Sequence, residues 1–407
     1  MSSSQKRVLP ILFGTLLLDM VGTGMIFPII PIIFTDPNSH AFLLHGYSQG
    51  MQFFLAGLVT ALFGLMQFIA APLLGELSDV YGRKKLLSLG IGTLAVSQIL
   101  FGFGIEIASI PLILFSRAIA GLAAANFSIA QATIADVTEP KDRAKNFGLI
   151  GAAFGTGFIV GPLLGGWIAG LTGDPAAPFW FAGALGVINL TFVTLMLQET
   201  NLNPRASHGF TVFKGIRNIQ AAIRDVDARP VYLTTFLYMS GFTFMTSFMG
   251  VFLVGKFGFD ETAVGTFFAA VGAWVIFTQL FLLRILASKY SERQIVRYTM
   301  LIMGAAMIAY PLLPSVPWLY IVMPFIAVSQ GLTMANLTSL VSKSVSAERQ
   351  GAALGINGSL MAFSQGAIPL VAGIGTGVIG ISMPLIIGGI IVWIAWSVLF
   401  IFMRRRA

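Results

Sequence analysis

Two ionisable side chains, Asp19 and Arg117, lie deep inside long apolar stretches of the sequence. At a helical rise of about 1.5 Å per residue, Asp19 would stand ~17 Å into the first stretch and Arg117 ~14 Å into the fourth. Charged groups are costly in lipid and mark functional sites there. We expect the two to face each other. Asp19 would then take up a proton outside and release it inside, because an apolar setting favours the neutral acid and a nearby Arg favours the carboxylate. The alternative is a static ion pair that joins two helices.

A second polar group fills the segment GELSDVYGRKK, residues 75–85, between two apolar stretches. Gly75 and Gly82 would let the backbone bend and approach a neighbour closely. Asp79 precedes the basic run Arg83–Lys85, so the segment should face the cytoplasm. We expect it to act as a latch between moving helices. The alternative is a solvated charge cluster whose exposed pairs contribute under ~1 kcal/mol each.

The composition is that of an integral membrane protein, with 56% hydrophobic residues, 10% charged residues and a mean hydropathy of +0.87. A soluble domain carries about 25% charged residues. At ~20 residues per span, the chain has room for about twelve helices, and its continuous apolar runs exclude a β-barrel. The fold class is therefore an all-α membrane protein.

The net charge of +8 follows the topology of the chain. Apart from Arg117 and Lys256, the 24 Lys and Arg residues lie at the N-terminus, in or beside every second loop, or in the basic tail at 404–406. This distribution predicts an even number of spans with both termini in the cytoplasm, and it does not indicate nucleic acid as a partner. The absence of cysteine excludes disulfides and thiolate metal sites.

The apolar periodicity predicts helices at the following ranges: 8–34, 48–75, 86–106, 108–136, 146–170, 177–197, 230–255, 262–287, 295–313, 317–343, 350–378 and 380–403. The longest polar break divides the chain into a six-helix bundle at 1–197, a linker at 198–229 and a second six-helix bundle at 230–407. Within the linker, Phe213, Ile216, Ile219 and Ile223 recur beside basic residues, which indicates an amphipathic helix on the cytoplasmic surface. A disordered linker is the alternative.

The two predicted bundles share a sequence pattern. Gly121 and Asn126 of the fourth helix recur as Gly331 and Asn336 of the tenth, and Pro162 recurs as Pro369, at offsets of about 210 residues. Matches in order at nearly one spacing indicate a duplicated six-helix unit. Duplicated bundles of this kind usually bind substrate at the membrane midplane between the two units.

These motifs resemble those of the major facilitator superfamily over essentially the whole chain. GELSDVYGRKK is similar to its loop 2–3 signature, and Arg117 with Gly121 resembles its helix 4 motif. Residues 155–166, GTGFIVGPLLGG, resemble the helix 5 motif of its antiporters, and residues 18–24, LDMVGTG, resemble helix 1 of its drug/proton antiporters, particularly the tetracycline exporters. Tetracycline exporters carry further intramembrane acids in helices 3 and 9. The stretches 94–99 and 300–305 hold none, which argues against tetracycline itself.

The resemblance implies that Asp79, Arg83 and Asp136 form a network that locks a cytoplasmic gate and reaches toward the eleventh helix. In the fifth helix, small residues and a proline should thin and bend the helix so that the eleventh can approach. They are Gly157, Gly161, Pro162, Gly165 and Gly166. That such a bend marks antiporters is implied by the resemblance alone.

One stripe of the fourth helix is assigned to the substrate cavity, because its members lie within about 40° of Arg117 at 100° per residue. They are Arg117, Gly121, Ser128 and Gln131. Asn126 lies on the opposite face, so we assign Asn126 and Asn336 to hydrogen bonds between helices. Further cavity candidates are amide, hydroxyl, methionine and aromatic residues of the second bundle: Tyr232, Thr235, Tyr238, Met239, Gln279, Gln330, Asn357, Met361, Ser364 and Gln365. They suit a large, mostly apolar substrate, although ordinary packing between helices is the alternative for each.

The sequence thus predicts a secondary transporter of a bacterial inner membrane, a multidrug efflux protein of the antibiotic-resistance type, that exports a hydrophobic or amphiphilic small molecule in exchange for protons. Import of a polar solute and lipid flipping on the same fold are the alternatives. An enzyme is not expected, because His40, His45 and His208 lie far apart in loops and no nucleophile or metal cluster accompanies them. We expect no metal and no cofactor beyond the coupling proton, the substrate and the bilayer as partners, and a monomer.

Overall fold

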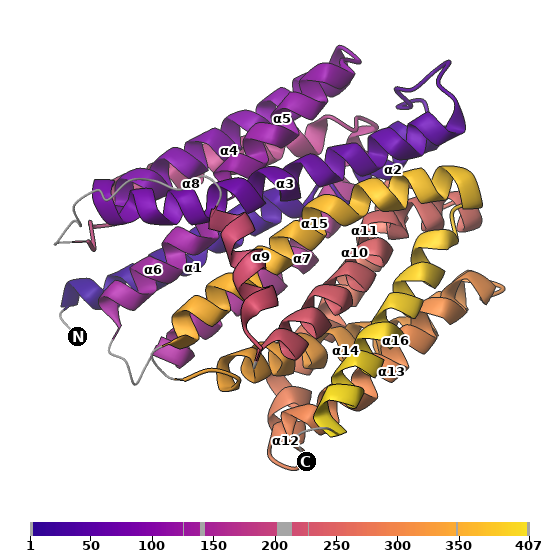
Figure 1. The fold of residues 1–407 in the computed structure, drawn as a ribbon. Coiled ribbons are helices and arrows are strands. Elements are labelled where there is room, and N and C mark those ends of the chain that lie inside the picture. The colour runs from indigo at the N-terminus through magenta and orange to yellow at the C-terminus, as the bar shows by residue number, and fades with distance from the viewer. Residues whose placement is uncertain are drawn as a thin grey trace.

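The computed structural model describes residues 3–124, 126–138, 143–201, 214–226, 228–346 and 349–404. Over these ranges the chain forms helices without strands, and twelve of the helical spans are long and apolar enough to cross a membrane. Six spans precede helix α9 (Lys214–Arg224) and six follow it, as two bundles (Figure 1). The predicted fold class is confirmed. Phe213, His208 and the tail Arg405–Arg406 lie outside the described residues.

The first bundle contains two interrupted spans. Its helices are α1 (Ser3–Gly24), α2 (Ile29–Thr35), α3 (Gln49–Tyr81), α4 (Arg83–Glu106), α5 (Ile110–Ala123), α6 (Asn126–Val137), α7 (Arg143–Thr172) and α8 (Ala177–Met196). The first interruption ends at Pro28, whose missing N–H cannot continue a helical hydrogen-bond ladder. The second break comes after Ala123, where α5 ends with Ala124 as its C-cap. The predicted ranges 8–34 and 108–136 correspond to the single spans Val8–Thr35 and Ile110–Val137.

The second bundle is built in the same way. Its helices are α10 (Arg229–Phe257), α11 (Glu261–Phe277), the π segment η2 (Thr278–Leu282), α12 (Leu283–Ala287), α13 (Glu292–Ala309), the 3-10 segment η3 (Tyr310–Leu312), α14 (Val316–Lys343), α15 (Gln350–Ile379) and α16 (Met383–Arg404). Polar caps fix several starts. Asp260 accepts from the backbone N–H of Ala263, and Ser291 forms a capping box with Gln294.

The end of the molecule at which Arg83, α9 and Arg349 lie is called the basic side, and the opposite end is called the far side.

The segment at 76–85, expected to be a polar turn, is almost entirely helical. α3 continues to Tyr81 and α4 begins at Arg83, so that Gly82 alone lies between them. The charges of the motif are therefore held on rigid helix ends and not on a mobile loop.

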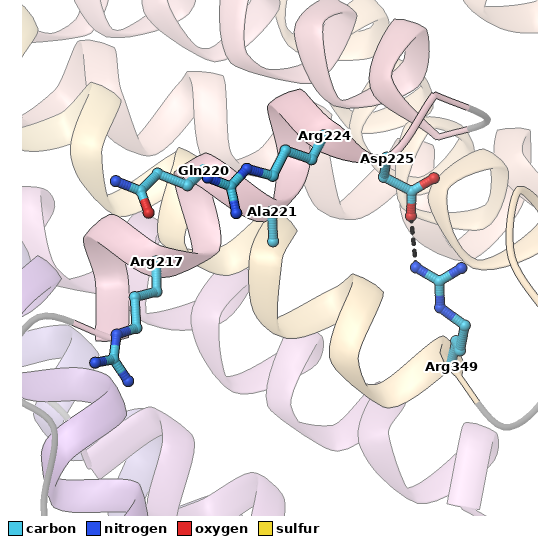
Figure 2. Close-up of a pocket in the computed structure, with 6 residues that line it drawn as sticks. All are labelled: Arg217, Gln220, Ala221, Arg224, Asp225 and Arg349. Atoms are coloured by element: carbon cyan, nitrogen blue, oxygen red, sulfur yellow. Dashed lines mark hydrogen bonds and ion pairs between the residues drawn. The ribbon is translucent and has the colours of Figure 1, made fainter.

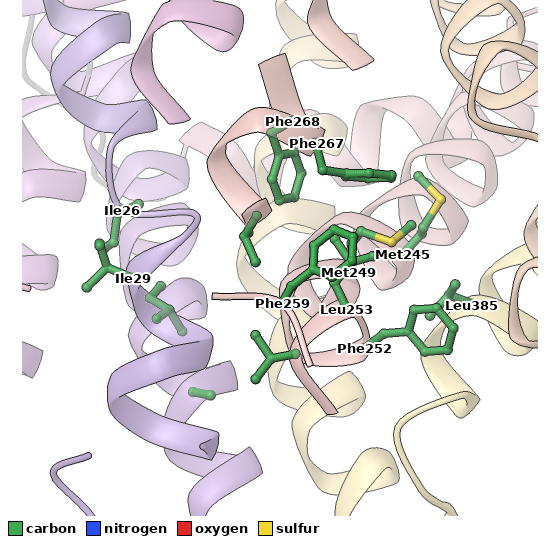
Figure 3. Close-up of a cluster of buried hydrophobic side chains, with 14 of the residues drawn as sticks. Ile26, Ile29, Met245, Met249, Phe252, Leu253, Phe259, Phe267, Phe268 and Leu385 are labelled. Carbon is green, nitrogen blue, oxygen red and sulfur yellow. The ribbon is translucent and has the colours of Figure 1, made fainter. Parts of the chain in front are cut away.

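On the far side, the two bundles are joined by one cluster of buried hydrophobic side chains. Figure 3 shows members from the α1–α2 region, from α10 and α11, and from α16: Ile26, Ile29, Met245, Met249, Phe252, Leu253, Phe259, Phe267, Phe268 and Leu385. The ring of Phe27 lies 5.6 Å from that of Phe268 and thus joins the two bundles. Burial of this much apolar surface holds the far side closed in this conformation.

Close backbone contacts between the bundles follow small residues. A Cβ on Gly373 of α15 would lie 2.6 Å from the carbonyl oxygen of Phe53 in α3, and a Cβ on Gly166 of α7 would lie 3.0 Å from the Cα of Gly265 in α11. Toward the basic side the same face of α15 lacks such contacts, because Cβ atoms on Gly351, Gly355 and Gly358 would meet no atom of the described residues within 4 Å. The bundles therefore pack tightly on the far side and separate toward the basic side.

Helix α9 (Lys214–Arg224) lies where the amphipathic pattern of the linker predicts a helix, and it crosses both bundles near the basic side (Figure 1). Its first residue forms an ion pair with Glu76 of α3. In its middle, Nδ2 of Asn218 donates to Oγ of Ser359 in α15 at 2.9 Å. The helix is therefore tied to each bundle by a polar contact.

Candidate functional site

The carboxylate of Asp19 lies buried inside the first bundle, with 5% of its surface exposed. Its Oδ2 accepts from Nδ2 of Asn126 in α6 at 2.9 Å, and its Oδ1 accepts from Nδ2 of Asn189 in α8 at 3.0 Å. Three helices that are far apart in the sequence thus converge on one acid. In the described part of the chain no cation forms an ion pair with it.

The local sequence makes room for this convergence. Asn126 is the first residue of α6, and its side chain is packed against Gly90 of α4, where a Cβ would come 3.0 Å from the Asn126 Cγ. One turn above Asp19, Nε2 of Gln98 donates to the carbonyl oxygen of Gly22 at 3.1 Å and ties α4 to α1. These contacts pack α4 against α1 and α6, and so hold Asp19 and its partner Asn126 in place.

The same residues can satisfy either protonation state of the acid. Among the described residues, the Oδ1 atoms of Asn126 and Asn189 are buried without a hydrogen-bond partner, as is the hydroxyl of Thr15 one turn before Asp19. An amide that donates to a carboxylate can turn over and accept from a carboxylic acid with its oxygen. Asp19 thus has donors for its charged form and idle acceptors for its protonated form. Such a site offers hydrogen-bond partners to both protonation states of the Asp19 carboxyl group.

The prediction that Asp19 faces Arg117 is wrong. Arg117 lies on α5 and turns toward α3, where its guanidinium stands 4.6 Å from the ring centroid of Phe63 and its Nε donates to the carbonyl oxygen of Val59 at 3.4 Å. The reason can be read from the helical wheel, which places Asn126 on the face opposite Arg117. Asp19 accepts from Asn126 and therefore lies on the face away from Arg117.

The cavity stripe predicted on the fourth span also packs on α3. A Cβ on Gly121 would lie 2.7 Å from the Cβ of Met66, and Oγ of Ser128 donates to the carbonyl oxygen of Ala71 at 3.2 Å. The cavity assignment is therefore wrong for Gly121 and Arg117, which are buried against α3, because a helical wheel does not say which neighbour lies on a given face. Ser128 is half-buried and Gln131 is exposed, so their assignment to the cavity stays a prediction.

Most candidates of the second bundle are held by contacts within and between helices. Oγ of Ser364 is 3.2 Å from that of Ser240 in α10, and the hydroxyl of Thr235 donates to the carbonyl oxygen of Val231 in its own helix. The other candidates differ in burial. Three are buried: Tyr232, Tyr238 and Met239. Gln330, Met361 and Gln365 are half-buried, and Gln279 is exposed. Among the described residues, three of these candidates have a buried polar atom without a hydrogen-bond partner: the hydroxyls of Tyr232 and Tyr238, and Oδ1 of Asn357. Nδ2 of Asn357 donates to the sulfur of Met361 at 3.6 Å.

Asn336 does not mirror Asn126. Its Nδ2 donates to the carbonyl oxygen of Leu332 in its own helix at 2.7 Å. The predicted hydrogen bond between helices is therefore present for Asn126 and absent for Asn336 among the described residues. Both bundles contain the asparagine, but among the described residues only the first bundle places an acid beside it.

A second polar cluster is built around Arg83 at the start of α4. Its Nη2 lies 2.5 Å from Oδ1 of Asp79, its Nε donates to Oδ2 of Asp136 at 3.0 Å, and its Nη1 donates to Oγ of Ser78 at 2.6 Å. Only 8% of the Arg83 side chain is exposed. The three residues that the motif implied are thus brought together with the arginine buried. In the described chain these bonds join α3, α4 and α6, and none reaches α15.

The sequence analysis missed the segment after α8, which completes this cluster. Glu199 accepts from the backbone N–H of Arg83 at 2.9 Å and of Lys84 at 3.1 Å, at the N-terminus of α4. Nδ2 of Asn201 donates to the carbonyl oxygen of Asp79 at 2.7 Å, at the C-terminus of α3. Glu199 and Asn201 therefore cap the two helix ends, and Oγ1 of Thr200 between them donates to Oδ2 of Asp136 in α6 at 3.4 Å. An acid directly after an apolar helix was the available signal.

Gly82 and Gly75, both in the same motif, have different roles. Gly82 has φ +97° and ψ 146°, a conformation open to glycine almost alone, and a Cβ there would lie 2.5 Å from Oε2 of Glu199. Gly75 is helical, and its Cβ would meet Oγ of Ser128 at an ordinary 3.7 Å. The predicted close approach therefore holds for Gly82 and is wrong for Gly75.

Gly82→Ala is expected to destabilise the protein by about 1–3 kcal/mol through backbone strain and loss of the Glu199 cap. Gly75→Ala is the matched control, expected to be neutral or stabilising by up to about 1 kcal/mol, since alanine is the better helix former. The unfolding temperatures of the purified proteins in one detergent decide between them. Equal unfolding temperatures for Gly82→Ala and the unsubstituted protein would contradict this account.

The glycines of α7 serve neighbours other than the predicted one. Gly161 would place a Cβ 2.7 Å from the carbonyl oxygen of Val21, and Gly165 would place one 2.8 Å from the Cα of Met25, so both pack on the α1 region. Gly157 also contacts this region, and Gly166 packs on α11. The expectation that this face admits the eleventh span is therefore wrong. Pro162 lies within α7 beside these contacts.

Comparison with known proteins places this geometry in one family. A sequence model of the Major Facilitator Superfamily matches residues 12–369. The chain is 28% identical over 362 residues to the tetracycline resistance protein, class C, of Escherichia coli, covering 88% of the chain and 86% of the relative. It is 27% identical over 362 residues to multidrug resistance protein 2 of Bacillus subtilis, covering 87% and 85%.

A solved structure agrees with the fold. The crystal structure of a bacterial homologue of the human lysosomal transporter Spinster, in an inward-facing and occupied conformation, superposes with a TM-score of 0.79 at 17% identity, covering 99% of this chain and 98% of that one. The arrangement of two six-helix bundles is therefore a known one.

Proposed function

This chain belongs to the major facilitator superfamily of membrane transporters, and we propose that it exports a hydrophobic or amphiphilic small molecule in exchange for protons. The export direction and the substrate class are supported by relatives that are named tetracycline and multidrug resistance proteins. The proposal extends to a bacterial inner membrane, with the basic side facing the cytoplasm, which the distribution of Lys and Arg supports.

The observation that carries proton coupling is the environment of Asp19. Burial away from water penalises its charge, and the two amide donors of Asn126 and Asn189 offset part of that penalty. A small movement of α6 or α8 would remove a donor and favour the protonated acid. Proton uptake and release at Asp19 would then follow the relative positions of these helices, which is what coupling requires.

Alternating access is supported by the unequal packing of the two sides. On the far side the bundles are joined by a hydrophobic cluster and by close contacts such as Gly373 on Phe53, whereas Gly355 and Gly358 of α15 stand free toward the basic side. Rocking the bundles about the midplane would separate them on the far side and bring them together on the basic side. The Arg83 cluster lies on the side that would then close, so we assign it to the gate of that side.

A vesicle assay tests the function directly. The protein is reconstituted with a pH-sensitive dye inside the vesicles, a pH gradient is imposed, and hydrophobic and amphiphilic drugs are added in turn. Antiport predicts that a transported drug accelerates proton movement and that the gradient drives drug accumulation. Labelled polar solutes and labelled lipids are run in parallel. Drug transport without proton movement would contradict antiport, and transport of lipids or polar solutes alone would contradict the substrate class.

A further inference from the structure

A basic pocket of about 550 Å³ lies on the outer face of α9, away from Asp19 and from the Arg83 cluster. It is lined by Arg217, Gln220, Ala221, Arg224, Asp225 and Arg349. Figure 2 shows the first four along one helix, with Arg349 reaching Asp225 from the start of α15. We propose that this pocket binds the phosphate-bearing headgroup of an anionic phospholipid.

The inner face of α9 is fully used in docking. Gly215 lies against Phe68 of α3, where a Cβ would come 2.8 Å from the ring, and Ala222 is 4% exposed. Ile219 packs on a buried cluster that includes Ala353 and Ile356 of α15. These contacts fix the rotation of the helix about its axis and so determine which residues face outward.

The outer face combines apolar and basic side chains. Ile216, Ile223 and Val226 are 46%, 61% and 68% exposed. Ile216 and Ile223 are about two helical turns apart and thus lie on one line along the helix. Arg217 and Arg224 have the same spacing and form a second line, about 100° around the helix from the first. Apolar side chains beside arginines are the pattern of a helix at the surface of a bilayer.

The charges of the pocket leave room for an anion. Nη2 of Arg349 lies 2.8 Å from Oδ2 of Asp225, which neutralises the one acid of the pocket. Arg217 and Arg224 have no acidic partner among the described residues and are exposed. Figure 2 shows the guanidinium of Arg224 close to the amide of Gln220, with Arg217 one turn before Gln220 on the same helix. Guanidinium and amide N–H groups are donors that phosphate oxygens accept from.

The position of α9 along the spans places the pocket at headgroup level. α3 has 33 residues, so it is ~50 Å long and exceeds the ~30 Å hydrocarbon layer by about 10 Å at each end. Lys214 pairs with Glu76, which lies ~8 Å from the basic end of α3. α9 therefore lies near the boundary between headgroups and acyl chains. The exposed isoleucines can enter the lipid there while the arginines reach the phosphates.

This placement favours a lipid over a soluble anion. A free phosphate would use Arg217 and Arg224 but would leave Ile216 and Ile223 exposed to water. A phospholipid satisfies both lines of the outer face at once, with its headgroup on the arginines and its acyl chains beside the isoleucines. The proposal is independent of what the protein transports.

Native mass spectrometry of the detergent-purified full chain tests the site, by titration with phosphatidylglycerol, phosphatidylcholine or inorganic phosphate. We expect phosphatidylglycerol to bind more tightly than phosphatidylcholine, and Arg217→Gln/Arg224→Gln to lose about 30-fold of its phosphatidylglycerol affinity. Arg284→Gln/Lys289→Gln removes the same charge from exposed positions on the basic side of the second bundle and should retain the affinity.

Three results would overturn the proposal. One is an unchanged lipid preference in Arg217→Gln/Arg224→Gln, and another is an equal loss in the Arg284→Gln/Lys289→Gln control. The third is displacement of phosphatidylglycerol by inorganic phosphate, which would make the site one for a soluble anion. Unfolding temperatures of both double variants, measured in detergent without added lipid, should equal that of the unsubstituted protein, because all four side chains are exposed.

Discussion

Asp19→Asn is expected to abolish proton-driven efflux while the protein remains folded in the membrane. Asparagine has the shape of aspartate, and its oxygen can accept from one of the two amides that Asp19 accepts from, those of Asn126 and Asn189. Its NH2 can donate to the oxygen of the other amide once that amide turns over. It cannot gain or lose a proton at any working pH. Drug accumulation against a gradient should therefore fall to the level of protein-free vesicles, while exchange of drug for drug continues because it needs no proton.

The two transport modes separate coupling from stability. Asp36→Asn is the control, since Asp36 lies outside the helices and its carboxylate accepts only the nearby N–H of Asn38 among the described residues. Proton-driven efflux and drug exchange are measured in the same vesicles for each variant. Proton-driven efflux by Asp19→Asn at the rate of the unsubstituted protein would refute the coupling role. Loss of both modes would assign Asp19 to structure.

Gly373→Val is expected to shift the protein toward a conformation that is open on the far side. A Cβ on Gly373 would lie 2.6 Å from the carbonyl oxygen of Phe53, so valine cannot be accommodated while α3 and α15 remain in contact. Overpacking of this kind costs about 1–3 kcal/mol. If the far-side contact is released in the other conformation, the ratio of the two changes by roughly 5- to 150-fold.

The absence of cysteine makes this shift measurable by spin labelling. Labels at Tyr47 and Val378, both exposed on the far side, should move apart in Gly373→Val. Labels at Tyr81 and Gln350 on the basic side should approach each other. Gly358→Val is the matched control on the same helix, because a Cβ at Gly358 meets no atom within 4 Å. Identical distance distributions in Gly373→Val and the control would contradict alternating access by rocking of these bundles.

The Arg83 cluster shows how far a local motif reaches. Asp79 and Arg83 are one helical turn apart, so their contact is nearly contained in the sequence, and the family resemblance added Asp136. The motif did not predict Glu199 and Asn201, which follow the last helix of the first bundle in sequence and cap the same two helix ends. Caps that arrive from a distant segment leave no periodic signal, because they depend on where another helix ends in space.

Apolar periodicity and charge placement determined the spans and their number, because bilayer thickness and the cost of buried charge act on each segment by itself. The family was indicated separately, by the resemblance of short motifs such as GELSDVYGRKK to those of the superfamily. Burial of Asp19 also followed from the sequence alone. Its partners did not, since a buried acid is equally compatible in one dimension with an arginine or with two asparagines. The packing of α1 against α6 and α8 brings the two asparagines to Asp19. The contact of α5 with α3 directs Arg117 away from it. A sequence gives each side chain a depth and a face, whereas the neighbour on that face is chosen by how the helices pack.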